Sequence, residues 1–471
     1  MTLATTTNRI RPQHAAIDAL TRRLRDDFGD RASTAQAIRE QHSHGEGLAD
    51  AALPDVVVFP HTNDEVSAIV RLCHAARIPI IAFGVGTSLE GHVAAIHGGA
   101  CLDFSQMNRV LEVNDADLDC RVQAGVTREQ LNAELKGTGL FFPIDPGANA
   151  TIGGMASTRA SGTNAVRYGT MRENVLGLTV ATAAGRIVKT GGRARKSAAG
   201  YDLTRLFVGS EGTLGIITEV QLRLYGLPEA ISAAVCQFPD LKSAVDTVIV
   251  AMQLGIPVAR IELLDDVQMD ACIRYSQLAE FAPKPTLFFE FHGTEAGVRE
   301  QAETIEALAA DHGGSRFQWA TKAEDRSRLW KARHNAYYAA LALAPGKQGF
   351  ATDACVPISR LTDCVLETQA DIVQTGLIAP IVGHVGDGNF HLVVLFDPAK
   401  ADERAKAEAL AARVAMRAIS MGGTCTGEHG VGMHKLHALV AEHGDAIALM
   451  QAVKRALDPH DILNPGKTVP P

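Results

Sequence analysis

The chain has no apolar run of the length that a membrane-spanning helix needs. Such a helix takes about 20 mainly apolar residues. The N-terminal stretch contains Arg9 and Arg11 but no apolar segment after them, so we do not expect a cleaved secretory signal. We expect a cytoplasmic protein, with peripheral contact to the inner face of the membrane as the alternative.

Signals for disulfides and for haem are also missing. The eight cysteines form neither a Cys-x-x-Cys pair nor the Cys-x-x-Cys-His motif that attaches haem. We therefore expect reduced cysteines that pack in the core. Cys425 lies close in sequence to Glu428 and His429, which makes it a candidate metal ligand, although packing is the simpler interpretation.

Length and charge exclude further classes. A chain of 471 residues is too long for one hydrophobic core, so we expect two or three domains. Its hydrophobic content of 46% with 21% charged residues is typical of a soluble globular protein. The net charge of −8 argues against a nucleic-acid partner.

Two common nucleotide-binding fingerprints fail. The glycine-rich stretch 84–91 follows an apolar strand, but its glycine spacing is not the G-x-G-x-x-G that opens a Rossmann helix. A nicotinamide cofactor is therefore not expected. Residues 191–197 end in Lys-Ser, but Arg195 stands where a Walker motif requires glycine.

Glycine-rich, hydroxyl-bearing segments are nevertheless abundant in the first half of the chain. Four of them occur within about 130 residues, at 84–91, 145–147, 151–157 and 209–218. Such segments can point backbone N–H groups at a pyrophosphate. Each segment alone could be an ordinary surface turn, but the series favours one long polar ligand laid against the backbone.

A second motif, Gly-His-Val-Gly-Asp-Gly-Asn-Phe-His, suggests a metal site at His384 and His391. If Asp387 and Gly388 are the central residues of a two-residue hairpin, His384 lies opposite His391, with Cβ atoms about 4.5–5.5 Å apart. Two imidazoles at that spacing can share one divalent ion. Glu428 and His429 follow between glycines and offer further ligands. The alternative is a polar glycine-rich turn without metal.

The pattern of periodicities indicates several domains. An amphipathic helix is expected over 13–28, followed from residue 56 by alternating strands and helices, and by an irregular segment over 143–170. After Pro228 the sequence predicts an antiparallel sheet with Ala-rich helices. We expect an α+β protein with an N-terminal helical segment (1–50), a cofactor domain (51–229), a substrate or cap domain (230–420) and a helical C-terminal segment (421–471) that packs back on the cofactor domain.

The motifs together resemble a known family. GVGTSLEG, DPGANATIGGMAS, RYGTMRENVLG and GSEGTLGIITEV resemble the two-part FAD-binding domain of the vanillyl-alcohol-oxidase or PCMH type. HVGDGNFH with TGEHGVG resembles its metal-dependent D-2-hydroxy-acid dehydrogenase branch, and residues 329–338 and 352–357 most resemble the FAD-dependent D-lactate dehydrogenases. The resemblance runs from about Ala52 to Lys467.

The resemblance implies roles for particular residues. His384, His391 and Glu428 would be the metal ligands, with Zn, Mn or Fe as the ion. His429 would be the base, unless it is a histidine that orients Glu428. Arg333 would bind the substrate carboxylate, unless it is a helix-surface arginine paired with Asp325 or Glu324. Tyr337 and Asn389 would also contact substrate. FAD would be held by Gly84, Val85, Gly86, Thr87, Ser88, Leu89, Pro146, Gly147, Thr151, Gly153, Gly154, Ala156, Ser157, Ser161, Gly162, Glu211, Gly212, Ile216, Ile217 and Asn464.

His92 raises the question of covalent flavin. It lies near the first glycine-rich segment, and some members of the wider superfamily attach flavin to a histidine. We expect non-covalent binding.

The implied reaction is oxidation of D-lactate to pyruvate, with hydride passing to flavin. Because the chain has no haem motif, the electrons would pass to an external acceptor, namely a cytochrome, a quinone or an electron-transfer flavoprotein. We expect a homodimer. Tyr337 would share a helix face with Arg333 and favour a short apolar substrate tail, although Lys347 is close in sequence.

Other functions stay open from the sequence. Within the branch, the alternatives are a D-2-hydroxyglutarate dehydrogenase and the FAD subunit of a glycolate oxidase. Outside this branch, a metallohydrolase would explain the histidines but not the glycine-rich half. A catalytically silent nucleotide-binding regulator would explain the glycine-rich half but not the histidines.

Overall fold

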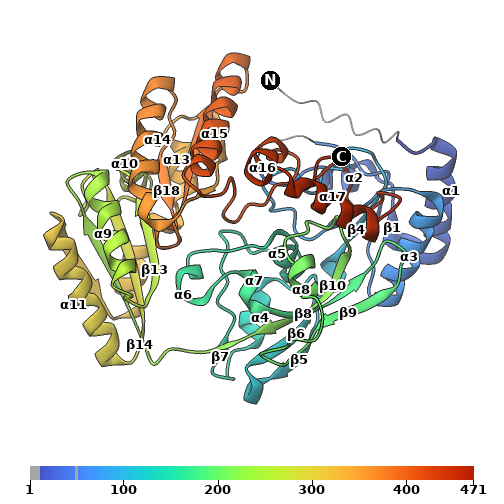
Figure 1. Cartoon of the computed structure of the whole chain (residues 1–471), viewed down its shortest axis with the longest axis horizontal. Coiled ribbons are helices and arrows are strands. Elements are labelled where there is room, and N and C mark those ends of the chain that lie inside the picture. The colour runs from blue at the N-terminus through green and yellow to red at the C-terminus, as the bar shows by residue number, and fades with distance from the viewer. Residues whose placement is uncertain (1–10, 48–50) are drawn as a thin grey trace. The chain divides into compact units, whose positions relative to one another are not determined.

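The computed structural model describes residues 11–47 and 51–471, which divide into two compact units (Figure 1). Unit 1 contains the described residues up to Ser161, Gly169–Leu227 and Glu428–Pro471, and unit 2 contains Gly162–Tyr168 and Pro228–Gly427. The domain ends that we expected from the sequence were 229 and 420. Both ends of the expected segment 1–50, including Arg9, lie outside the described residues.

The first sheet of unit 1 has the order β1-β2-β4-β3, in which β2, β4 and β3 are parallel. Helix α1 (His14–Phe28) buries its apolar side in the core of this sheet, as its periodicity predicted. The carboxyl ends of parallel strands share one edge, so the Gly84 loop after β3 starts at that edge. The elements are β1 (Ala32–Ser33), α2 (Gln36–Gln41), β2 (Val56–Val58), α3 (Asn63–Ala76), β3 (Ile80–Phe83) and β4 (Ala100–Asp103).

The second sheet of unit 1 is antiparallel, in the order β5-β6-β10-β8-β9. Its strands are β5 (Val110–Asn114), β6 (Asp119–Gln123), β8 (Val175–Ala181), β9 (Ile187–Gly191) and β10 (Ile216–Arg223). Helices α4 (Arg128–Glu134) and α5 (Ile152–Thr158) add Leu131, Ile152 and Met155 to its core.

The expectation of an irregular segment over 143–170 is wrong in part, because the segment contains α5 and α6 (Ala165–Tyr168). The Thr151 hydroxyl accepts a hydrogen bond from the Gly154 amide and caps α5. This cap and the burial of Ile152 and Met155 form a helix despite two adjacent glycines.

The C-terminal segment completes unit 1. Ile80 of β3 donates its amide hydrogen bond to the Ile462 carbonyl and accepts one from the Asn464 amide, so residues 462–464 form a parallel bridge beside β3. Helices α16 (Leu436–His443) and α17 (Ala446–Leu457) precede this bridge. The smaller elements of the unit are β7 (Leu140–Phe141), α7 (Met171–Asn174), α8 (Leu203–Phe207) and β11 (Tyr225–Gly226).

Unit 2 is built on one antiparallel sheet, with the main strand order β15-β12-β14-β13-β18-β19-β16 and β17 paired to β19. The strands are β12 (Ala230–Gln237), β13 (Val258–Leu264), β14 (Thr286–Gly293), β15 (Ser315–Ala320), β16 (Gln348–Ala351), β17 (Ala354–Cys355), β18 (Ile381–Gly383) and β19 (Asn389–Phe396). The helices are α9 (Leu241–Gln253), α10 (Asp266–Ser276), α11 (Glu295–Asp311), α12 (Ala323–His334), α13 (Ala336–Ala342), α14 (Leu361–Thr375) and α15 (Ala401–Ser420).

One face of this sheet is covered by helices and carries two charged residues of β13. Helices α10, α12 and α13 pack against the face that carries Leu264 and Phe288. Side chains alternate along a strand, so Arg260 and Glu262 of β13 point to the same face as Leu264. Two charged residues of a central strand therefore lie under a helical cover, which calls for buried partners.

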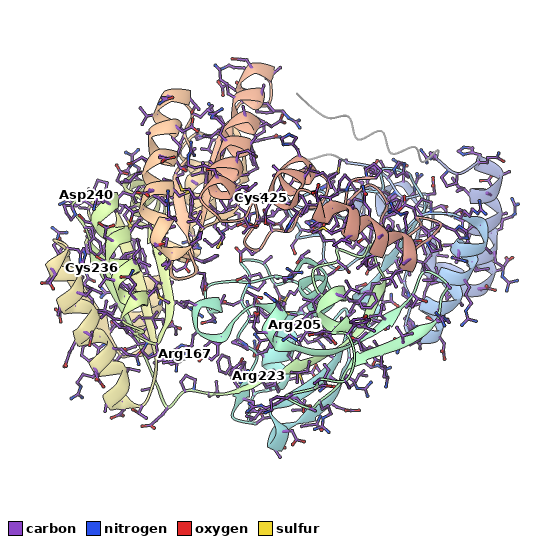
Figure 2. The ribbon with its side chains drawn as sticks, in the orientation of Figure 1. Arg167, Arg205, Arg223, Cys236, Asp240 and Cys425 are labelled. Atoms are coloured by element: carbon purple, nitrogen blue, oxygen red, sulfur yellow. The ribbon has the colours of Figure 1, made fainter. Side chains whose placement is uncertain are left out.

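The cysteines are free, and all but Cys355 are buried. Burial raises the pKa of the Cys236 thiol to about 11, which keeps it protonated at neutral pH. Cys236 and Cys425 belong to unit 2 and are labelled in Figure 2. No helix in the part of the chain that the structure describes is both long and apolar enough to cross a membrane.

Helices α14 and α15 are tied by Asp371, whose carboxylate lies 2.8 Å from Arg413 and 2.9 Å from Arg417. Hydrogen bonds from Arg413, and then from Arg417, hold the pKa of Asp371 below its usual range. We expect Asp371→Asn to lower the free energy of unfolding by about 1–3 kcal/mol at neutral pH. Urea unfolding followed by circular dichroism measures this.

The difference should depend on pH in one direction. A carboxyl with a depressed pKa stabilises fully above its unfolded value of about 3.9, and this stabilisation is lost as the pH falls through the folded value. The exposed pair of Asp402 and Lys406 on α15 provides the control, since Asp402→Asn should change stability by no more than about 1 kcal/mol. Equal effects of the two substitutions on stability would contradict the prediction that the ion pairs of Asp371 stabilise the fold.

Candidate active site

The two motif histidines lie at the turn between β18 and β19. The predicted two-residue hairpin is wrong, because the register pairs Val382, not His384, with His391. The His384 carbonyl accepts hydrogen bonds from the amides of Asp387 and Asn389, which closes a 3-10 turn over Val385–Asp387 before Gly388 takes a positive φ. The two imidazole rings nevertheless lie with centroids 5.3 Å apart and planes at 78°.

Each ring is fixed through its Nδ1 atom. His384 Nδ1 lies 2.7 Å from Glu262 Oε1, and His391 Nδ1 lies 2.9 Å from the Thr352 carbonyl oxygen. A carboxylate and a carbonyl only accept hydrogen bonds, so Nδ1 carries the proton in both rings. A neutral ring with its proton on Nδ1 carries its lone pair on Nε2, the atom that can bind a metal ion.

Glu428 directly follows Gly427, the last residue of unit 2. His384, His391 and Glu428 each offer a ligand atom, and these atoms lie within 4.8 Å of one another. Two imidazole nitrogens and one carboxylate oxygen suit zinc, manganese or iron. The donor set therefore fits a divalent metal ion, and Cys425 is not part of it.

Glu262 is the residue that sequence reasoning missed. It is fully buried on β13, and its Oε2 lies 2.7 Å from Arg333 Nε. Burial alone would raise the pKa of Glu262, but His384 and Arg333 hold it below its usual range. Arg333 is thus paired with Glu262 rather than with Asp325 or Glu324. A glutamate between Ile261 and Leu263, in a strand whose only other charged residue is Arg260, was the available signal.

The expected base, His429, belongs to a charged cluster in unit 1. Glu90 Oε1 lies 3.5 Å from His429 Nδ1 and 3.0 Å from Lys435 Nζ, and Glu90 Oε2 lies 3.4 Å from His434 Nδ1. Burial raises the pKa of Glu90, but Lys435 and the two histidines hold it well below its usual range. The Glu90 carboxylate thus lies within ion-pair distance of His429, His434 and Lys435. Glu90 was not assigned a role from the sequence.

Glu211 supports the loop that carries His429. Its carboxylate accepts hydrogen bonds from the amides of Val431 and Gly432, at 2.7 and 2.8 Å, and from the Thr468 hydroxyl at 2.7 Å. Gly430 has a φ of +83°, and a Cβ there would lie 2.6 Å from Glu211 Oε1. Glycine is thus favoured at position 430 by its backbone conformation and by the space beside Glu211. Glu211 was expected at the cofactor.

His92 packs beside the same carboxylate. His92 Nε2 lies 3.3 Å from Glu211 Oε2, close enough for an ion pair but not aligned for a hydrogen bond. Asn464, another expected cofactor residue, donates hydrogen bonds to the carbonyls of His92 and Glu211.

The glycine-rich segments come together within unit 1. A Cβ on Gly84 would lie 2.2 Å from Thr151 Oγ1, so the first segment packs directly against the start of α5. The Gly209 and Glu211 amides donate to the carbonyls of Ala156 and Ser157, which joins the last segment to the same helix. Loops far apart in sequence thus form one surface.

This surface fits a long polar ligand. The Ser88 and Ser210 hydroxyls are buried without a hydrogen-bond partner among the described residues, as expected where a ligand would supply one. Thr87, Leu89, Gly153 and Gly154 lie in the joined segments, Pro146 and Gly147 lead into α5, and Ile216 and Ile217 begin β10. Ser161 ends the first stretch of unit 1, whereas Gly162 belongs to unit 2.

The sequence predicted that Arg333 and Tyr337 share one helix face. This prediction is wrong, because the two residues lie on different helices. Helix α12 ends at His334 and α13 begins at Ala336. The Tyr337 hydroxyl donates a hydrogen bond to the Gly349 carbonyl at 3.3 Å, and its ring contacts Tyr338. Lys347 lies 2.8 Å from Glu403, which neutralises its charge.

Asn389, expected to contact substrate, uses its amide nitrogen within unit 2. It donates to Asp353 Oδ1 at 2.7 Å and to the Ala354 carbonyl at 2.9 Å. These bonds attach the start of β19 to β17, beside His391.

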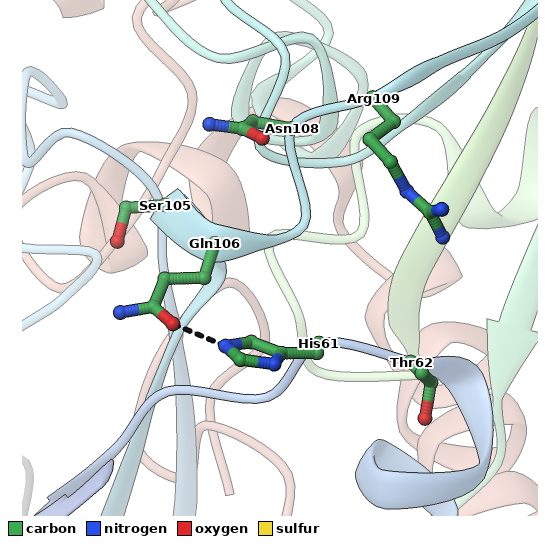
Figure 3. Close-up of a pocket in the computed structure, with 6 residues that line it drawn as sticks. All are labelled: His61, Thr62, Ser105, Gln106, Asn108 and Arg109. Carbon is green, nitrogen blue, oxygen red and sulfur yellow. Dashed lines mark hydrogen bonds between the residues drawn. The ribbon is translucent and has the colours of Figure 1, made fainter.

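A hollow of about 500 Å³ elsewhere on unit 1 contains none of the expected residues. It is lined by His61, Thr62, Ser105, Gln106, Asn108 and Arg109, and His61 is hydrogen bonded to Gln106 (Figure 3). All six residues are exposed, so this is an open surface feature and not a buried catalytic pocket.

Family models cover most of the chain. The FAD binding domain matches residues 54–191, and the C-terminal domain of FAD linked oxidases matches residues 227–468. The solved structures of 4-ethylphenol oxidase from Gulosibacter chungangensis and of p-cresol methylhydroxylase superpose with TM-scores of 0.80 and 0.79 at 17% identity. These superpositions cover 98% of both chains and 97% of both chains, respectively. They confirm the expected PCMH-type α+β fold.

Curated relatives are closer in sequence. The probable mitochondrial D-lactate dehydrogenase of Danio rerio is 52% identical, over 97% of this chain and 92% of that protein. The mitochondrial D-lactate dehydrogenase [cytochrome] of Arabidopsis thaliana is 48% identical, over 89% and 74%. The glycolate oxidase subunit GlcD of Bacillus subtilis is 36% identical, over 88% and 89%.

The relatives correct one expectation and confirm another. Cytoplasmic location is contradicted, because the relatives from Danio rerio and Arabidopsis thaliana are mitochondrial proteins. The expected FAD is confirmed by the two family models. With both models matched and a relative 52% identical over nearly its whole length, the chain belongs to the FAD-linked oxidases and is an FAD-dependent oxidoreductase.

Proposed function

We propose that the chain oxidises D-lactate and similar small D-2-hydroxy acids to the 2-keto acids, with a divalent metal ion held by His384, His391 and Glu428. The observation that carries this proposal is that acceptors hold Nδ1 of both histidines, while ligand atoms of His384, His391 and Glu428 lie within 4.8 Å of one another. The D-lactate dehydrogenases among the relatives support the substrate.

The bound groups supply two kinds of chemistry. When bound, FAD would supply a hydride acceptor, and a divalent metal ion held by the three ligands would supply Lewis acidity that makes the substrate hydroxyl easier to deprotonate. His429 takes the hydroxyl proton near neutral pH, with Glu90 orienting its ring. Arg333 binds the substrate carboxylate through its terminal nitrogens, since its Nε is used by Glu262.

Electrons leave the flavin for an external acceptor. The relative from Arabidopsis thaliana is named D-lactate dehydrogenase [cytochrome], which favours a cytochrome over a quinone or an electron-transfer flavoprotein. The homodimer and the contact with a membrane surface stay predictions. A metallohydrolase does not account for the FAD-binding half.

Removal of the metal ion should abolish turnover and leave FAD bound, because the metal ligands and the glycine-rich cofactor segments are different residues. We expect the same of His384→Ala. Metal analysis, the flavin absorption spectrum and D-lactate turnover with an artificial acceptor measure these effects. His312→Ala, at the residue that directly follows α11, is the control. An active protein that contains no metal would contradict the proposed ligand set.

Loss of the base should separate chemistry from metal binding. We expect His429→Ala to slow flavin reduction by D-lactate by about 10²–10⁴-fold with metal content unchanged. Stopped-flow absorption measures the reduction, and His437→Ala on the exposed side of α16 is the control. Loss of metal together with activity would instead make His429 a ligand.

Substrate preference should follow the size and charge of the tail. Lys347 is neutralised by Glu403, so we expect no charge there for a second carboxylate. D-lactate should exceed D-2-hydroxyglutarate in kcat/KM, and glycolate, which lacks the methyl group, should be about 10-fold poorer or worse. Steady-state kinetics with D-lactate, D-2-hydroxybutyrate, glycolate and D-2-hydroxyglutarate decides this. A preference for D-2-hydroxyglutarate would overturn the substrate while leaving flavin and metal intact.

A further inference from the structure

Glu262 holds two functional groups with one carboxylate. Its Oε1 lies 2.7 Å from Nδ1 of His384, and its Oε2 lies 2.7 Å from Nε of Arg333. The residue is fully buried in β13, which lies between β14 and β18 in the sheet. Both partners are thus attached to a rigid strand, although His384 stands in a turn and Arg333 on a helix.

A second buried group in unit 2 also consists of a glutamate, a histidine and an arginine, but its histidine makes different contacts. Glu290 of β14 lies 2.9 Å from Nε2 of His292 and 3.4 Å from Nε of Arg260. The other ring nitrogen of His292, Nδ1, is hydrogen bonded to the Tyr168 hydroxyl at 2.8 Å. Both nitrogens of His292 are therefore used within unit 2, and Glu290 contacts its Nε2, whereas Glu262 contacts Nδ1 of His384. The Glu290 group is structural.

We propose that Glu262 is a positioning residue that sets the metal site and the carboxylate clamp relative to each other. The inference rests on the proposed function of His384 and Arg333. Glu262 keeps the proton of His384 on Nδ1, so Nε2 is available to the metal ion. It also fixes the plane of the Arg333 guanidinium, whose terminal nitrogens then point in a defined direction.

The substrate needs this fixed spacing. A 2-hydroxy acid that reaches the metal ion through its hydroxyl group must meet Arg333 with its carboxylate a fixed two bonds away. Productive geometry requires placement within about 0.5 Å. A turn and a helix end held independently would not maintain such a spacing, whereas two oxygens of one buried carboxylate do.

Glu262→Gln tests the assignment with little change of shape. An amide has one accepting end and one donating end, so it cannot accept from both His384 Nδ1–H and Arg333 Nε–H. We expect the metal affinity to fall about 10–100-fold. At saturating metal, KM for D-lactate should still rise about 10-fold, because the loss at Arg333 is separate from the loss at His384.

The experiment uses the full FAD-loaded chain. Equilibrium dialysis with Zn²⁺ and with Mn²⁺ gives the metal affinity, and kinetics at saturating metal give KM and kcat. Glu290→Gln is the matched control, since it also breaks a buried Glu-His-Arg group, and it should leave both values unchanged. Flavin absorption and thermal unfolding report whether each variant is folded.

Two further variants keep the test decisive. Glu262→Asp retains the charge but is too short to reach both partners, so it should weaken one or both functions even if Glu262→Gln fails to fold. Arg333→Lys keeps the Glu262–His384 bond and should raise KM with metal affinity within about 3-fold of the parent.

The outcomes separate the inference from the proposed function. A parent chain that binds no metal overturns the proposed metal site and the inference with it. A parent that binds metal, with Glu262→Gln and Glu262→Asp matching it in metal affinity and KM, overturns the inference alone. Equal losses in the Glu290→Gln variant would also overturn it, because the effect would then be general to buried carboxylates.

Discussion

The hydrogen bonds at Nδ1 of His384 and His391 are the constraint on which the candidate site depends. A neutral imidazole has one donor and one acceptor nitrogen, so fixing the donor also fixes which atom can bind a cation. In this chain the two acceptors differ in kind, a carboxylate for His384 and a backbone carbonyl for His391. The sheet of unit 2 supplies both acceptors, because Glu262 lies in β13 and Thr352 directly follows β16.

Unit 1 has a corresponding organisation around buried carboxylates. Glu90 and Glu211 are both buried, and each contacts groups from the segment after Glu428. Lys467 adds a further tie, with hydrogen bonds to the Ala94 carbonyl and Asn464 Oδ1. Lys467 is buried, and this burial lowers its pKa to about 7. The loop with the expected base is thus held by residues of the cofactor half.

The sequence predicted best what depends on local conformation. Gly430 and Gly388 are needed for backbone reasons, so the motifs that contain them were visible without a structure. The register of the turn between His384 and His391 could not be predicted from the sequence. It depends on the hydrogen bonds that the Asp387 and Asn389 amides donate to the His384 carbonyl in the folded chain. The break between α12 and α13 was also hidden, since Asn335 fits a helical pattern and its Nδ2 bonds Ser276 only in the folded chain.

Glu262 shows the limit of motif reasoning in another way. Its role depends on contacts with residues 71 and 122 positions away, and no short pattern around it indicates them. A glutamate flanked by apolar residues in a strand has many explanations. Only the sheet order, which places β13 next to β18, brings it to the histidine.

The pairing of residues 462–464 with β3 has a consequence for how the protein is made. Unit 2 is inserted into unit 1, so a ribosome delivers the whole of unit 2 before it delivers the segment from Glu428 onward. The backbone hydrogen bonds of Ile80 with Ile462 and Asn464 can therefore form only after the roughly 200 residues of unit 2 have been synthesised. The cofactor half, although it begins first, is the last part of the chain to be completed.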